Sequence, residues 1–260
     1  MRSRCPMPDV DSELAVTARP RLPEPYILGA PRRDAVIAGI AAVVTIGAFA
    51  AVADHTALAH IQRVDDFWLR VMVAGRLAPV TSIAKVFNFL GLVYVTLPVR
   101  IAIGAYLGFR RRWWHLAAFA GAVILSEILI GPLKASYDRV RPPGSLVATT
   151  AASFPSGHAV AASVTALAAV IALVPPGSRR IAWGLAAAFF ALAMALSRAY
   201  LGAHWLSDAL AGLLLGTSCA LLAASLADLA QRRWRLSSRR RSSDPHQIPL
   251  SAAGRPDSHE

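Results

Sequence analysis

The sequence predicts an all-α integral membrane protein built as a bundle of six transmembrane helices. Hydrophobic residues make up 55% of its 260 residues, and charged residues make up only 16%. Six apolar segments approach the roughly 20 residues that a helix needs to cross the hydrocarbon core of a bilayer. Several of them are longer than the buried helices of soluble proteins, so a soluble helical bundle is disfavoured.

The expected spans follow one another without a fixed-period repeat. The fourth and fifth are short, and their flanking residues are expected to extend them. In chain order the spans are Ala35–Ala53, Leu90–Phe109, Trp114–Leu133, Ala159–Val174, Ile181–Leu196 and Ser207–Leu229.

Both ends of the chain differ from this apolar centre. Residues 1–34 are polar and proline-rich and have no apolar run behind a basic start, so we expect a disordered tail and not a secretory signal peptide. Residues 231–260 are rich in arginine, serine and proline and are expected to form a second disordered tail. The membrane domain is therefore assigned to residues 35–230.

The positions of the basic residues predict the orientation. A net charge of +12 could suit a nucleic-acid partner, but the apolar content disfavours one. With six spans both tails lie on one side, where 18 of the 27 lysine and arginine residues fall, against eight on the other. The positive-inside rule then places both termini in the cytoplasm and the protein in the cell (inner) membrane. The loops 54–89, 134–158 and 197–206 face outward, and residues 67–73 are typical of a helix lying in the interface.

Residues suited to chemistry are concentrated in the two shorter outward loops. Lys134 ends the third span, and Arg141-Pro142 follows after six intervening residues. The tetrapeptide Pro155-Ser156-Gly157-His158 directly precedes the fourth span. The last group comprises Ser197, Arg198, His204 and Asp208.

Several of these residues together predict a phosphate site. Lys134, Arg141 and Arg198 are three cations with few acidic residues near them in the sequence. Arginine binds phosphate in a fork, and lysine binds it as a point charge. Ser156 precedes a helix start, where backbone N–H groups and the helix dipole favour an anion. Gly157 would let the backbone approach that anion closely.

Two histidines and an aspartate predict the chemistry at this site. His204 and Asp208 are four positions apart and would share one face of a helix. A carboxylate that accepts from one ring nitrogen leaves the other free as a nucleophile, and His158 is suited to act as the general acid. The sequence has no Asp/Glu cluster for Mg²⁺, and Cys5 and Cys219 lack metal-ligand spacing. We therefore expect phosphoryl transfer without a metal or another cofactor.

Each feature has a simpler explanation when it is taken alone. Basic residues at the ends of spans are commonly interface anchors. Pro-Ser-Gly before an apolar run is an ordinary helix start, and a His–Asp pair at this spacing is often a surface pair. Their occurrence in fixed order on one expected membrane face favours a catalytic site.

Together these residues resemble the signature of the type 2 phosphatidic acid phosphatase (lipid phosphate phosphatase) superfamily. Its three parts, K-x6-R-P, P-S-G-H and S-R-x5-H-x3-D, match here without substitution, and the resemblance covers about residues 35–230. The spans favour the membrane branch over the soluble vanadate-dependent haloperoxidases. The resemblance implies a six-helix membrane phosphatase with its active site at the extracytoplasmic face.

The resemblance also implies a role for each residue. His204 would attack phosphorus and form a phosphohistidine, supported by Asp208. His158 would protonate the leaving oxygen, and water would then hydrolyse the intermediate. The phosphate oxygens would be held by Lys134, Arg141, Ser156, Gly157, Ser197 and Arg198.

The leading functional hypothesis is the hydrolysis of a lipid phosphate monoester or diphosphate. The resemblance implies four candidates: polyprenyl (undecaprenyl) diphosphate, phosphatidic acid, phosphatidylglycerol phosphate and a polyprenyl-phosphoryl sugar phosphate. An isoprenoid lipid or phosphatidic acid is favoured. One alternative is a phosphotransferase that passes the phosphoryl group to a lipid or sugar hydroxyl. The other, a catalytically inert lipid-binding protein, is disfavoured by the presence of His158, His204 and Asp208.

Two charged residues fall inside the expected spans. Arg100 lies in the second span and Glu127 in the third. An unpaired charge inside a bilayer is costly, and the two spans are expected to be antiparallel neighbours. We therefore predict an ion pair between Arg100 and Glu127 with a structural role.

Overall fold

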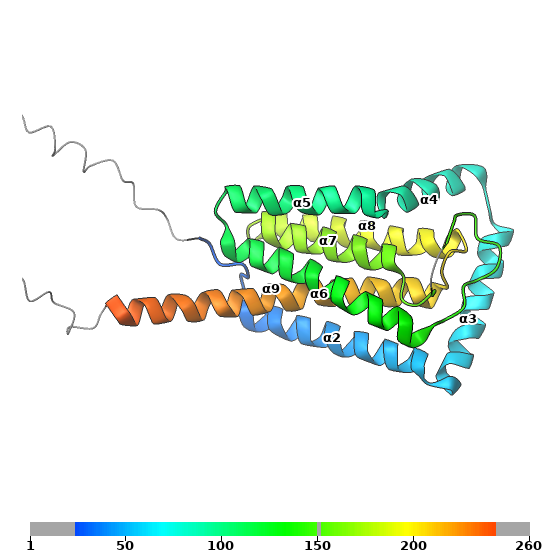
Figure 1. Ribbon diagram of the computed structural model, residues 1–260, viewed down its shortest axis with the longest axis horizontal. Helices are drawn as coiled ribbons and strands as arrows, with labels where there is room; N and C mark the ends of the chain where they lie inside the picture. Colours follow the sequence, from blue (N-terminus) through cyan, green and yellow to red (C-terminus); the bar gives the residue numbers. More distant parts are fainter. Residues whose placement is uncertain (1–23, 150–151, 243–260) are drawn as a thin grey trace, which may run out of the picture.

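The computed structural model describes residues 24–149 and 152–242, and the described part is helical with connecting turns and loops. Six helices lie side by side, and α3 crosses one end of the bundle beside α4 (Figure 1). The helices are α2 (Pro31–Ala53), α3 (His55–Ala74), α4 (Ala78–Leu90), α5 (Val93–Phe109), α6 (Trp113–Tyr137), α7 (Gly157–Leu173), α8 (Ser178–Tyr200) and α9 (Leu206–Ser242).

Four of the described helices, α2, α6, α8 and α9, are long and apolar enough to cross a membrane. The expected second span, Leu90–Phe109, corresponds to α5, which begins at Val93, and to the last residue of α4, which meets α5 at a bend of 52°. Counted as one broken span, this pair makes a fifth candidate. Helix α7 is apolar but has only 17 residues. The fold is thus an all-helical membrane bundle, and the six-span topology stays a prediction.

Helices α7 and α9 form the centre of the bundle and pack closely. Alanine and serine line α7, and two glycines one turn apart, Gly212 and Gly216, line α9. A Cβ on Gly212 would lie 2.5 Å from the carbonyl oxygen of Ser156, and one on Gly216 would overlap the Ser163 hydroxyl and lie 2.6 Å from the carbonyl oxygen of Val160. Small residues of this kind let membrane helices approach each other. This contact sets the position of the α7 N-terminus against α9.

Gly216→Ala is expected to destabilise the detergent-solubilised protein by about 1–3 kcal/mol, because the added methyl group overpacks the α7–α9 contact. The Ser163 hydroxyl cannot move at no cost, since it donates 2.8 Å to the carbonyl oxygen of Ala159. Thermal unfolding measures the effect. The matched control is Gly184→Ala in α8, where a Cβ would meet nothing within 4 Å. Alanine favours the helix there, so equal melting temperatures for the two variants would contradict the packing argument.

Residues 24–34 were expected to belong to a disordered tail, and this part of the expectation is wrong. Ile27 is fully buried, and the backbone N–H of Leu28 donates to the Asp228 carboxylate at 3.0 Å. The Glu24 carboxylate accepts from two backbone N–H groups at the start of α6, at 3.3 and 3.2 Å. Apolar burial and this helix cap hold the segment in place despite its prolines. Residues 1–23 lie outside the described part of the chain.

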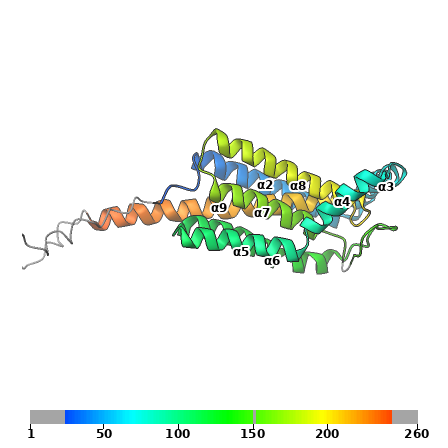
Figure 2. The same cartoon turned by 90° about the horizontal axis from the view of Figure 1, so that it is seen from above.

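The expected C-terminal tail also begins too early, because α9 continues to Ser242 and projects beyond the neighbouring helices (Figure 2). Gln231 is fully buried and donates 3.1 Å to the carbonyl oxygen of Pro25. Arg232 pairs with Asp228 one turn earlier at 2.6 Å, and its guanidinium lies 4.1 Å from the centre of the Tyr26 ring. Such (i, i+4) ion pairs stabilise helices. Residues 243–260 lie outside the described part.

The predicted intramembrane ion pair is confirmed. Arg100 Nη1 lies 2.7 Å from Glu127 Oε1, and Arg100 Nε donates 2.9 Å to the Thr165 hydroxyl. The pair therefore joins α5 to both α6 and α7, and its structural role remains a prediction.

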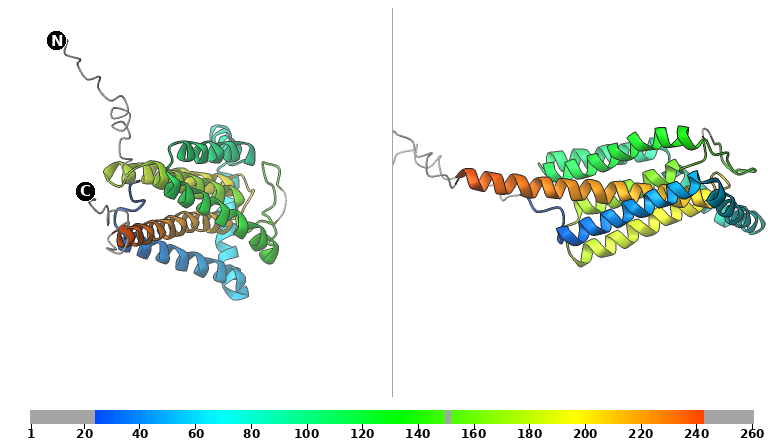
Figure 3. Two further views of the ribbon diagram at one scale, coloured as in Figure 1. Left: turned by 60° about the vertical axis from the view of Figure 1, so that its left-hand side comes forward. Right: turned by 90° about the horizontal axis from the view of Figure 1, so that it is seen from below.

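The two described ends of the chain lie at the same end of the bundle. Seen from below, the C-terminal part of α9 extends from one end while α3 lies across the other (Figure 3). The helix order brings the ends of α6 and α8, and the beginnings of α7 and α9, to the end that carries α3 (Figure 1). The motif residues are located at these helix termini.

Candidate active site

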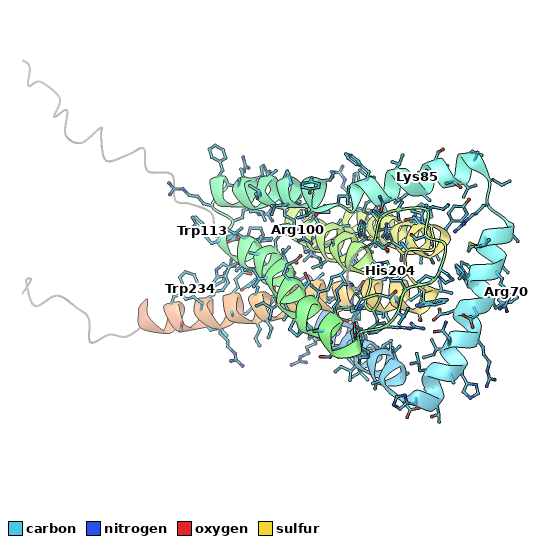
Figure 4. The ribbon with its side chains drawn as sticks, turned by 45° about the vertical axis from the view of Figure 1, so that its right-hand side comes forward. Arg70, Lys85, Arg100, Trp113, His204 and Trp234 are labelled. Carbon is cyan, nitrogen blue, oxygen red and sulfur yellow. The ribbon has the colours of Figure 1, made fainter. Side chains whose placement is uncertain are left out.

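The site residues come from four helix termini and two loops at the α3 end of the bundle. Lys134 lies in the last turn of α6, Ser156 is the N-cap of α7, and Arg198 lies in the last turn of α8. His204 lies in the short connection to α9 (Figure 4). The fold thus gathers at one end residues that are up to 74 positions apart in the sequence.

The buried His204 ring is held in one tautomer by two hydrogen bonds. Its Nδ1 lies 2.7 Å from the carbonyl oxygen of Ser153, which can only accept, so Nδ1 carries the proton. Its Nε2 lies 3.2 Å from Arg141 Nη1, which can only donate, so Nε2 offers its lone pair. Both contacts assign the same tautomer. The nitrogen that faces the cationic residues is therefore the one that carries the lone pair.

Asp208 does not accept a hydrogen bond from His204, contrary to the expectation from their spacing. Its Oδ2 lies 3.9 Å from His204 Nδ1, beyond hydrogen-bond range. The carboxylate instead accepts from Arg139 Nη1 at 2.6 Å, from the backbone N–H of Trp205 at 3.0 Å and from the Ser153 hydroxyl. His204 precedes the first residue of α9, so the helical (i, i+4) geometry does not apply. Asp208 acts on the ring through its charge and through Ser153.

Arg139 is a site residue that the sequence analysis missed. Its guanidinium, 8% exposed, donates to Asp208, to Asp65 at 2.8 Å and to the Ser207 hydroxyl at 2.7 Å. A second arginine two positions before Arg141 was the available signal, because two cations this close in sequence can serve different partners. Arg141 faces His204, and Arg139 faces the carboxylate of Asp208 behind that ring.

The three expected cations converge near His204. Lys134 Nζ donates 2.7 Å to the carbonyl oxygen of Ala152, and Arg141 donates to the carbonyl oxygens of Ala152 and Ala203 at 3.3 and 2.5 Å. Arg198 donates to the Asn88 side chain. Neither Lys134 nor Arg198 forms a salt bridge within the described residues. Their positive charge is thus available to an anionic ligand.

Three expected site residues each carry a buried polar atom without a hydrogen-bond partner in the described part of the chain. These atoms are Ser156 Oγ, His158 Nε2 and Arg198 Nε. Buried polar atoms in native proteins are almost always paired. Ser156 Oγ and Arg198 Nε can donate to the oxygens of a phosphate group, which is the ligand predicted from the sequence, and His158 Nε2 is a third unpaired polar atom beside them.

His158 is positioned by two residues of the α4–α5 break that the sequence analysis did not identify. The backbone of Asn88 lies close enough to its ring to oppose the lowering of its pKa. A Cβ on Gly91 would lie 2.5 Å from its Cδ2 atom, so the ring packs directly on that glycine. The bend between α4 and α5, at the start of the expected second span, therefore lies against the expected general acid.

Two expected phosphate ligands are less directly supported. The Ser197 hydroxyl donates 2.7 Å to the carbonyl oxygen of Met194 within α8, so its described bond is to its own helix and not to the pocket. A Cβ on Gly157 would meet Ile130 at an ordinary 3.5 Å, so the surrounding protein does not require glycine there. Phosphate binding by these two residues stays a prediction.

Burial lowers the pKa of His204 from about 6.5 to about 4, and the charges of Arg141 and Arg198 add to this effect against the opposing charge of Asp208. Because the neutral form dominates above the pKa, the Nε2 lone pair is expected to remain available at pH 5. A ¹⁵N NMR titration of histidine-labelled protein should show the Nδ1–H tautomer from pH 8 to pH 5, with protonation near pH 4. The signal is assigned by its loss in His204→Ala. Titration of His204 near pH 6.5 would contradict the buried environment.

Comparisons with known proteins cover the region that contains these residues. A sequence profile of the PAP2 superfamily matches residues 115–232, which contain all nine expected site residues. The chain is 30% identical over 165 residues to phosphatidylglycerophosphatase B of Bacillus subtilis (strain 168), an alignment that covers 60% of this chain and 79% of that protein.

Solved structures show the same fold. The crystal structure of a transmembrane PAP2-type phosphatidylglycerolphosphate phosphatase from Bacillus subtilis gives a TM-score of 0.60 at 25% identity, covering 72% of this chain and 93% of that one. The crystal structure of Aquifex aeolicus LpxE gives a TM-score of 0.50 at 22% identity, covering 60% and 91%. The second likeness concerns the fold alone.

Proposed function

Because this chain belongs to the PAP2 superfamily of membrane lipid phosphatases, we propose that it hydrolyses a lipid phosphate monoester or diphosphate through a phosphohistidine intermediate. The observation that carries this proposal is the assigned tautomer of His204. Its unprotonated Nε2 faces Arg141, and Lys134 and Arg198 belong to the same pocket. A neutral nucleophile beside a cluster of cations suits attack on an anionic phosphorus centre.

In the first step His204 Nε2 attacks phosphorus, and the bond from phosphorus to the lipid oxygen breaks. The imidazole gains positive charge as the P–N bond forms, and the buried carboxylate of Asp208, 3.9 Å from Nδ1, stabilises that charge. Lys134, Arg141 and Arg198 hold the equatorial oxygens, with the hydroxyl of Ser156 as a further donor. Burial and the charge of Arg198 lower the pKa of His158 to about 3, so His158 takes up the proton it will donate together with the anionic phosphate group, whose charge favours the cationic ring. His158 then gives this proton to the departing lipid oxygen, so the product leaves as an alcohol, or as a lipid monophosphate from a diphosphate.

In the second step a water molecule hydrolyses the phosphohistidine. His158, now neutral, accepts a proton from the water while its oxygen attacks phosphorus, and the P–N bond breaks to regenerate His204. Inorganic phosphate is released, and His158 is again protonated. The net reaction consumes one water molecule and leaves every protein group as it began.

The proposed orientation has both termini in the cytoplasm and the site at the extracytoplasmic face. Two observations support it. The basic residues are concentrated toward the termini, and the motif residues lie at the opposite end of the bundle from the beginning of α2 and the end of α9 (Figure 1). The site would then receive lipid phosphate from the outer leaflet.

An apolar groove next to the site supports a lipid substrate. It has a volume of about 300 Å³ and is lined by the end of α4 and by α5, α7 and α8, including Leu90, Val99, Ala162 and Phe190. Ala162 lies one turn below His158 on α7, so a chain in the groove would extend away from the phosphate site. The similar Bacillus proteins are phosphatidylglycerophosphatases, which makes phosphatidylglycerol phosphate a candidate beside polyprenyl diphosphate and phosphatidic acid.

The test is phosphate release by detergent-purified protein from a panel of these three lipids, with and without EDTA. We expect release from at least one lipid, unaffected by the chelator. Reversible loss in EDTA with recovery in Mg²⁺ would contradict the metal-free mechanism. Transfer of labelled phosphate to an added lipid alcohol without phosphate release would indicate a phosphotransferase. No turnover of any lipid would favour the inert lipid-binding protein.

A further inference from the structure

Helix α3 buries a single residue, and that residue is a carboxylate. Asp65 is 2% exposed, whereas apolar residues of the same helix are open to the surroundings: Val64, Phe67, Val71 and Val73 are between 42% and 59% exposed. Leu58, Ile61 and Met72 of this helix are only partly buried against the core of the bundle. The contacts of the fully buried Asp65 therefore need an explanation beyond apolar packing.

Asp65 makes three short contacts, all with residues adjoining Asp208. Its Oδ1 accepts from the backbone N–H of Ser207 at 2.9 Å. Its Oδ2 accepts from the Ser207 hydroxyl at 2.5 Å and from Arg139 Nη2 at 2.8 Å. Ser207 is the second residue of α9, where backbone N–H groups lack partners within the helix. Asp65 thus caps, from another helix, the helix that carries Asp208.

Arg139 continues this chain of charges to the nucleophile. Its Nη2 binds Asp65, and its Nη1 binds Asp208 Oδ1 at 2.6 Å. Asp208 in turn lies 3.9 Å from the protonated nitrogen of His204. The buried residues Asp65, Arg139 and Asp208 alternate in charge, and Asp208 lies beside the His204 ring that is proposed to attack phosphorus.

We propose that Asp65 is a positioning residue for catalysis, an inference that rests on the proposed function. If Asp208 were the only carboxylate partner of Arg139, the guanidinium would neutralise most of the negative charge of Asp208. With Asp65 as the second partner, the charge of Arg139 is offset, and Asp208 keeps negative charge for the cationic phosphohistidine. Stability alone does not explain this arrangement, because buried ion pairs are often replaceable by apolar residues without loss.

Asp65→Asn tests the proposal, because it removes the charge and keeps the shape. We expect kcat for the best lipid of the panel to fall by roughly 10- to 100-fold. Losses of this size are typical when a residue that orients a directly acting group is replaced. The inhibition constant of inorganic phosphate, which reports binding to the cationic pocket, should change less than about threefold. The control is Asp54→Asn in the N-cap of the same helix: Asp54 is exposed, and asparagine caps equally well.

Moving the carboxylate from position 65 to position 62 distinguishes a positioning role of Asp65 in catalysis from a role in folding alone. Gln62 Oε1 also accepts from Arg139 Nη2, at 2.7 Å, and Gln62 Nε2 donates 2.9 Å to Asp66. In the variant Gln62→Glu with Asp65→Asn and Asp66→Asn, a carboxylate again faces Arg139, and the amide introduced by Asp66→Asn can donate to it. This variant and Asp65→Asn have the same net charge. Recovery of at least tenfold in kcat is expected only if Arg139 needs the charge.

Each result decides a different question. A kcat of Asp65→Asn within twofold of the unchanged protein would overturn the inference, as would a normal melting temperature with no recovery in the relocated variant. If Asp65→Asn does not accumulate in the membrane, the relocated variant is compared with the unchanged protein. A kcat of the relocated variant within tenfold of the unchanged protein then supports the inference. A larger loss of kcat, with the melting temperature of the relocated variant unchanged, overturns it. Inactivity of the unchanged protein on every lipid would instead count against the proposed function.

Discussion

His204→Ala is expected to reduce phosphate release by at least about 10⁴-fold, the scale of loss when a covalent nucleophile is removed. The ring supplies the only atom proposed to bond to phosphorus, and its Nε2 lone pair is already directed toward the cationic pocket. Neighbouring groups do not replace it, because Arg141, Arg198 and Lys134 are cations. The measurement is phosphate release from the best lipid of the panel, compared with buffer alone.

The binding of inorganic phosphate should survive this substitution, because the proposed clamp consists of other residues. His60→Ala is the matched control, since His60 is an exposed histidine on α3 and lies outside the site. We expect it to leave the activity unchanged. If His204→Ala retained more than about one hundredth of the activity, the phosphohistidine mechanism would be wrong, and direct attack by water would have to be considered.

Arg139→Met is expected to lower both stability and activity. It leaves Asp65 and Asp208, 2% and 0% exposed, without the guanidinium between them. Removing one partner of a buried ion pair costs about 3–5 kcal/mol, so a large fall in the melting temperature of the detergent-solubilised protein should follow. Activity should fall as well, because the carboxylate behind His204 loses its position.

The control for Arg139→Met is Arg63→Met, which removes the same charge from an exposed position on α3. Adding Asp65→Asn to Arg139→Met removes one of the two unpaired buried charges and should restore part of the lost stability. A melting temperature of Arg139→Met equal to that of Arg63→Met would show that the buried pairs contribute nothing to folding.

The grouping of the site residues could be predicted from the sequence because they occur in short segments with fixed spacing. Lys134 and Arg141, the tetrapeptide ending in His158, and His204 with Asp208 each lie within a dozen positions of one another. The expected outward loops meet in space because they connect neighbouring antiparallel helices. The ion pair of Arg100 and Glu127 could be predicted because a charge inside a membrane requires a partner.

The site contacts and tail boundaries that the sequence did not predict depend on single residues that contact partners far away in the sequence. Asp65 and Arg139 are 74 positions apart and belong to no spaced motif. The hydrogen bond of His204 goes to Ser153 because the ring precedes the helix. The boundaries of the two tails were misjudged for a similar reason. Composition indicated disorder, but Ile27 is buried and Gln231 binds the backbone of the N-terminal segment.

The contact between Arg141 and the nucleophile has a consequence for unwanted reactions. While Arg141 Nη1 donates to His204 Nε2, the lone pair that would attack phosphorus is occupied. An anion that draws the guanidinium onto its own oxygens uncovers this lone pair at the moment it arrives. Neutral electrophiles cannot do so, and they meet a shielded imidazole. The enzyme would thus resist accidental alkylation or acylation at its most reactive atom, and the charge of the substrate itself would serve as the trigger.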